Sequence, residues 1–168
     1  MAEEAKTNEV QREDLPLSKA AMYLLEECRM VLPGIQAIFG FQLVVVFNPG
    51  FSQKLSVSEQ HLHLVAITLL AIAITLIMAP AAYHRQTGPL EVTSGFIRLA
   101  SRLLLASMAP LALGICIDFY LVSHVIYPGT IIPWLATALF AFIITLWFVL
   151  PRIPRLTGNG SQRSRRDK

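Results

Sequence analysis

The sequence predicts an all-α integral membrane protein, an antiparallel four-helix bundle with both termini in the cytoplasm. Apolar residues make up 54% of the 168 residues and charged residues only 15%, whereas soluble domains carry about 25% charged residues. The apolar residues also gather in four long runs, and each run is close to the roughly 20 residues that a helix needs to cross a bilayer. The predicted spans are residues 30–48, 62–83, 103–126 and 131–150.

The lysines and arginines predict the orientation of the bundle. Thirteen of the 14 lie before the first span, between the second and third spans, or after the fourth span, and only Lys54 lies on the other side. Cytoplasmic loops carry an excess of these residues, so we expect both termini on the cytoplasmic side of the cell (inner) membrane. The formal charge of +3 follows from this asymmetry and is not evidence for nucleic-acid binding.

The chain enters the membrane after two short segments. Residues 1–16 are polar and acidic, and we expect them to be disordered. Residues 17–29 have helical amphipathic spacing, which predicts a helix along the cytoplasmic interface. Pro33 should then redirect the chain inward. No basic stretch precedes the first apolar run, so we expect no signal peptide, and a four-span membrane domain should occupy residues 17–151.

The connections and the tail complete the predicted topology. Pro-Gly turns at 47–51 and 127–130 should join the spans on the outer side. Residues 152–168 form a basic cytoplasmic tail. Two interpretations of the tail remain open: it binds anionic lipid head groups, or it only sets the orientation.

Small residues predict where the helices pack. Ala71, Thr75 and Ala79 recur every four residues in the second span, and the fourth span repeats the pattern. Such spacing lets helix backbones approach closely in lipid. The corresponding residues of the fourth span are Thr137, Ala141 and Thr145.

Several stretches taken together resemble a known family. "LLEECRMVLPGIQAIFGFQLVVVFNPGF", "APAAYHR", an aspartate in the third span and "LWFVLP" at the end of the fourth resemble the small bacterial membrane proteins called domain of unknown function 6328. The resemblance covers residues 23–151 and implies a four-span protein of uncharacterised function. "GFIRLASR", before the third span, is less basic than in the family. The matching positions are Glu27, Arg29, Gly34, Gln36, Gly40, Phe41, Pro80, His84, Arg85 and Asp118.

The usual catalytic and phosphate-binding motifs are absent from the sequence. Two cysteines are also too few for an iron–sulfur or structural zinc site. We therefore expect neither an enzyme nor a cofactor. The bilayer is the expected partner, and a second copy or another membrane protein remains an open alternative.

Asp118 is the main functional candidate, because a carboxylate inside a membrane span is costly and rare. It lies on one helix face with Ser107, Leu111 and Gly114, so we expect it to face the bundle or a subunit interface. Its hydrogen-bond donor should be Gln42 of the first span or a histidine of the outer half.

The other polar candidates have simpler structural explanations. Gln36, like Gln42, can bond across a helix interface. Glu26 and Arg29 are three residues apart, which suits an ion pair at the interface. His84 and Arg85 can satisfy the carbonyl end of the second span. Whether His61, His63 and His124 converge stays open at this point.

Two functional classes therefore remain. One is a non-catalytic membrane scaffold or partner subunit, in which Asp118 makes a structural pair. The alternative is a small ion- or proton-coupled transporter or channel-like subunit that uses Asp118. We favour the scaffold from the sequence, because a conduction path normally needs more than one buried ionisable group.

Overall fold

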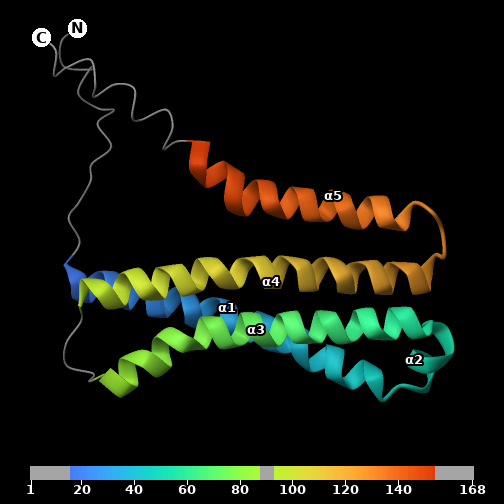
Figure 1. Ribbon diagram of the computed structural model, residues 1–168, viewed down its shortest axis with the longest axis horizontal. Helices are drawn as coiled ribbons and strands as arrows, with labels where there is room; N and C mark the ends of the chain where they lie inside the picture. The colour runs from blue at the N-terminus through green and yellow to red at the C-terminus, as the bar shows by residue number, and fades with distance from the viewer. Residues whose placement is uncertain (1–15, 88–92, 154–168) are drawn as a thin grey trace, which may run out of the picture.

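The computed structural model describes residues 16–87 and 93–153, and every regular element within these ranges is helical (Figure 1). Four of the helices are long and apolar enough to cross a membrane. The predicted helical membrane bundle is therefore confirmed. The elements are α1 (Leu17–Val46), α2 (Pro49–Lys54), α3 (Val57–Thr87), α4 (Ser94–Ile126) and α5 (Ile132–Ile144), which continues through a π-helical turn (Thr145–Val149) and a 3-10 turn (Leu150–Arg152).

The first helix differs from the prediction. The expected interfacial helix at 17–29 and the expected span at 30–48 form one helix, α1, and Pro33 lies inside it without ending it. Proline is tolerated within membrane helices, because neighbouring helices, side chains and local adjustments of the helix satisfy the backbone group that it frees. One buried stripe also runs the length of α1 and holds both parts against the same neighbours. It consists of Ala21, Leu24, Cys28, Ile35 and Gln42.

The connection between α1 and α3 is built by local caps. The Asn48 side chain accepts a hydrogen bond from the backbone N–H of Gly50 at 2.9 Å, and Pro49 opens the short helix α2. Ser56 and Glu59 then form a reciprocal capping box at the start of α3. Because of this box, α3 begins at Val57, five residues before the predicted start of the second span.

The pair α3 and α4 forms the most extensive helix contact, and α1 packs against both of them. The two helices approach closely at Gly114 of α4, where an added Cβ atom would clash with Leu70 Cδ1 of α3. The missing side chain of Gly114 thus lets α3 pack closely against α4. In contrast, α5 lies along the side of α4, away from α1 and α3 (Figure 1).

The prediction that repeated small residues mark the packing faces was wrong for most of these positions. Thr75 is exposed, and so are Thr137, Ala141 and Thr145. Each of these threonines donates its hydroxyl to the carbonyl four residues earlier in its own helix. A threonine that is satisfied in this way needs no partner on another helix.

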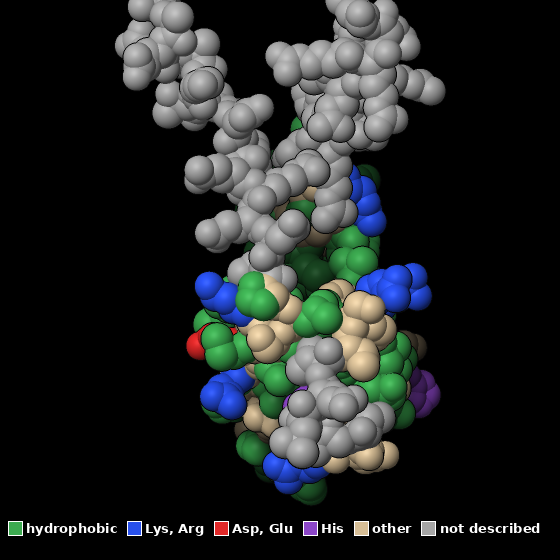
Figure 2. Space-filling view, turned by 90° about the vertical axis from the view of Figure 1, so that its left-hand side faces the viewer, with side chains coloured by type: hydrophobic (Ala, Val, Ile, Leu, Met, Phe, Trp, Pro, Cys, Tyr) green, Lys and Arg blue, Asp and Glu red, His purple; other side chains and the backbone are tan. Residues whose placement is uncertain are grey.

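The charge asymmetry in the sequence is an asymmetry between the two ends of the folded bundle. Lys and Arg side chains surround the end at which α1 begins and α3 ends (Figure 2), and Lys54 lies at the opposite end, in α2. The predicted disordered segment 1–16 and basic tail 152–168 fall outside the described residues, apart from Pro16, Arg152 and Ile153.

Candidate functional site

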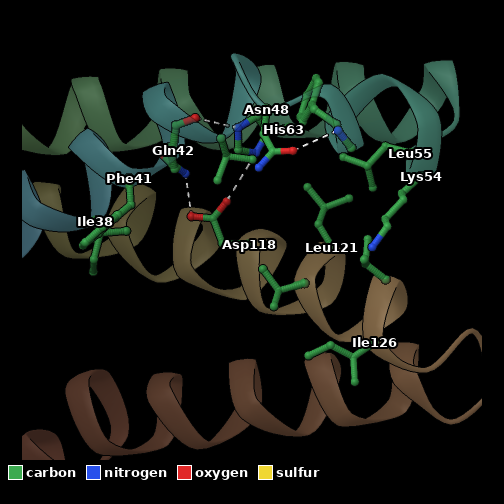
Figure 3. A pocket seen from close by; sticks show the side chains of 15 residues that line it. Ile38, Phe41, Gln42, Asn48, Lys54, Leu55, His63, Asp118, Leu121 and Ile126 are labelled. Carbon is green, nitrogen blue, oxygen red and sulfur yellow. Dashed lines mark hydrogen bonds and ion pairs between the residues drawn. The ribbon is translucent and has the colours of Figure 1, made fainter.

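Three polar side chains from three helices meet near the α2 end of the bundle (Figure 3). Gln42 of α1 donates a hydrogen bond from Nε2 to Asp118 Oδ2 of α4 at 2.5 Å. His63 of α3 places Nδ1 3.8 Å from Asp118 Oδ1. Gln42 and His63 are buried, whereas the Asp118 side chain keeps 20% of its surface exposed. Both kinds of donor expected for Asp118, the Gln42 amide and an outer histidine, therefore lie beside the carboxylate.

The backbone fixes which nitrogen of His63 carries a proton. His63 Nε2 lies 3.1 Å from the backbone carbonyl oxygen of Gln42. A carbonyl oxygen only accepts hydrogen bonds, so Nε2 must donate. The second nitrogen, Nδ1, is the one that faces Asp118.

The cluster borders an open cavity of about 490 Å³ that is lined by the second half of α1, α2, the start of α3 and the last turns of α4 (Figure 3). Its walls are largely aliphatic and aromatic, with Phe41 on α1 and Leu121 and Val122 on α4. Lys54 lies across the cavity from Asp118 (Figure 3). The size is within the range of small-molecule pockets, which are typically about 300–1,000 Å³.

The structure separates the two glutamines that the sequence put forward together. Gln42 is 4% exposed and belongs to the cluster. Gln36 is exposed on the surface of the chain and takes no part in the site.

The other candidates lie away from the cavity. Glu26 and Arg29 are both exposed, and the expected ion pair between them is absent from the described part of the chain. His84 and Arg85 do occupy the last turn of α3, as predicted. The His84 ring also lies 5.4 Å from the ring of Phe96 at the start of α4, so it packs between helices as well as lying near the last carbonyls.

The outer histidines do not converge. His63 faces Asp118, His124 lies 3.4 Å from Glu59 Oε1, and His61 is exposed. Within residues 16–87 and 93–153, no group of three or more His, Cys, Asp or Glu side chains is arranged to hold a metal ion.

Sequence reasoning named His63 only as one of three outer histidines and missed the cavity, although a signal that distinguishes His63 exists. His63 lies seven residues before Leu70 and fourteen before Ile77, and both of these are buried on α3. A polar residue in register with a seven-residue core stripe is at a helix interface. Gln42 follows Ile35 in the same way. No comparable signal marks the cavity, because the cavity depends on how far α1 diverges from α4.

Comparison with known proteins identifies the family and nothing beyond it. The profile of the family of unknown function DUF6328 matches residues 11–151, and the chain belongs to this family. No curated protein and no solved structure matches the chain.

Proposed function

For this member of the DUF6328 family, we propose a proton-coupled role in the membrane, in which Asp118 and His63 together bind and release one proton beside the cavity. The observation that carries the proposal is the placement of His63 Nδ1 3.8 Å from Asp118 Oδ1. The sequence alone favoured a scaffold because it offered a single buried ionisable group. His63 supplies the second group, and paired ionisable residues inside a membrane typically mark proton, ion or substrate pathways.

The charges of Asp118 and His63 depend on each other, because the two side chains lie close together in a region of low dielectric constant. With Nε2 bonded to the Gln42 carbonyl, a single added proton can reside on Asp118 or on His63 Nδ1, and the pair is neutral in either case. Without that proton the pair carries one negative charge. An uncompensated charge in a low-dielectric region is strongly disfavoured. In the proposed role, the two side chains therefore take up and release their proton as one unit.

The rest of the proposal follows from charge and composition. We propose that the termini are cytoplasmic, which puts the cavity in the outer half of the membrane. We also propose that the protein is not an enzyme. The bilayer is its constant environment, and the basic tail contacts anionic head groups.

A scaffold or partner subunit remains the second candidate, and one observation favours it. Gln36 is exposed in an otherwise apolar stretch of α1. An amide in hydrocarbon gains roughly 0.6–2 kcal/mol from a hydrogen bond across a helix interface. A second copy or a partner helix over this face would provide one.

Infrared spectroscopy of the detergent-purified protein tests the proton site. A protonated carboxyl group and a carboxylate absorb at different frequencies, so a pH titration of protein labelled with ¹³C-aspartate reports on Asp118. We expect a protonated carboxyl band that responds to pH and is lost in Asp118→Asn but retained in Gln36→Leu. If the difference between the spectra of wild type and Asp118→Asn does not change with pH, the proton-coupled role is wrong and the scaffold is preferred.

A further inference from the structure

The cavity beside Asp118 has apolar walls and a carboxylate at its bottom. Phe41, Leu121 and Val122 provide hydrophobic surface, and the partly exposed Asp118 carboxylate opens onto the same space (Figure 3). Apolar ligands gain free energy from such walls in proportion to the area they bury. A ligand that also carries a positive charge would in addition meet the carboxylate.

A second oxygen strengthens the preference for a cation. Gln42 Oε1 is buried, and no group in the described part of the chain donates a hydrogen bond to it. The amide nitrogen of the same side chain donates one of its two N–H groups to Asp118. The base of the cavity thus combines the Asp118 carboxylate with an acceptor oxygen that has no donor, and the negative charge of the carboxylate suits a cation better than an anion.

We infer that the cavity binds a hydrophobic organic cation, such as a bulky amine or quaternary onium ion, in competition with the proton shared by Asp118 and His63. This inference rests on the proposed function. When the cation enters, it compensates the carboxylate, and the proton leaves the pair for solvent. When the proton returns, the pair is neutral and the cation loses its electrostatic partner. One positive charge is exchanged for another, so the site stays neutral in both states.

The other charged groups near the cluster do not change this balance. From α2, Lys54 lines the cavity on the side opposite Asp118 and is exposed (Figure 3), where solvent and head groups screen it. On α3 and α4, Glu59 and His124 pair with each other. The described length of α5 contains no ionisable side chain. Asp118 and His63 therefore set the charge of the site.

Two ions of nearly equal shape and opposite charge test the inference. Binding of tetraphenylphosphonium and of tetraphenylborate to the full chain is measured by equilibrium dialysis in detergent, and proton release is followed in weak buffer. We expect the phosphonium to bind with release of one proton, and its affinity to fall by up to about tenfold per pH unit on acidification, the limit for one competing proton. The borate should show no binding that depends on Asp118.

Variants separate the charge from the shape of the site. Asp118→Asn should weaken phosphonium binding by at least about tenfold and remove its pH dependence. Val122→Trp should fill the cavity and block binding while leaving the infrared titration of Asp118 intact, because Val122 lines the cavity and its side chain makes no polar interaction. Leu113→Trp is the matched control, since Leu113 is also exposed on α4 but does not line the cavity.

The outcomes distinguish the two proposals. Equal binding of both ions, or phosphonium binding without proton release, overturns the inference and indicates that the cavity holds apolar molecules such as a lipid chain. Absence of phosphonium binding also overturns it, even when the Asp118 carboxyl still titrates. Loss of that infrared titration overturns the proposed function itself.

Discussion

Two glutamines of α1, six residues apart in the same apolar helix, lie in opposite environments. Gln42 is buried and bonded to Asp118, and its carbonyl also anchors His63. Gln36 is on the exposed face of α1. Glycine shows the same contrast, because Gly114 lies against Leu70 whereas no atom lies within 4 Å of a Cβ added at Gly40. The importance of a residue in this protein therefore depends on its register with the buried stripes more than on its type.

The largest effect should come from filling the close contact between α3 and α4. Gly114→Val puts methyl groups into Leu70 and near the backbone of Ala66, and we expect a loss of about 3 kcal/mol because an overpacked core strains its neighbours. Gly40→Val is the control and should leave stability nearly unchanged. Reversible unfolding in mixed micelles measures both, and equal effects would contradict the assigned packing.

An intermediate effect is expected at Gln42. Gln42→Leu removes the donor to Asp118, and the loss should be about 1–2 kcal/mol because a partly buried carboxylate is left without its hydrogen bond. Gln36→Leu should change stability by less than about 0.5 kcal/mol in the isolated chain. The same unfolding measurement applies. A greater cost for Gln36→Leu would show that the exposed face of α1 is covered in the purified protein and would favour a partner subunit.

The smallest effect on stability should come from Asp118→Asn. The amide oxygen can still accept from Gln42, so we expect a loss of at most about 1 kcal/mol. Proton binding should nevertheless be lost, since an amide does not titrate. Asp118→Leu completes the series. If this variant is as stable as wild type and binds protons equally, Asp118 has neither a structural nor a proton-binding role.

The fold was largely predictable because lipid imposes simple rules. Apolar run length predicted four spans, and α1, α3, α4 and α5 occupy them. The join between residues 17–29 and the first span was not predictable from Pro33 alone. A proline that ends helices in water is tolerated where tertiary contacts continue on both sides of it, and those contacts are long-range.

The site was predictable only in part. Asp118 lies in an apolar span and on the same helix face as Gly114, and both facts indicated a carboxylate turned toward another helix. Choosing Gln42 over Gln36 required the stripe through Cys28 and Ile35. The cavity depends on how far α1 diverges from α4 and on the position of α2. Both depend on caps and packing that no single residue encodes.

Nitrogen-15 NMR of His63 tests the central claim, that Asp118 and His63 share one proton, most directly. The resonances of His63 in histidine-labelled protein are assigned by their loss in His63→Gln. We expect Nε2 to stay protonated across the pH range, because it donates to the Gln42 carbonyl, and Nδ1 to change protonation in a transition that moves to a different pH in Asp118→Asn. A transition at the same pH in wild type and Asp118→Asn would contradict the shared proton.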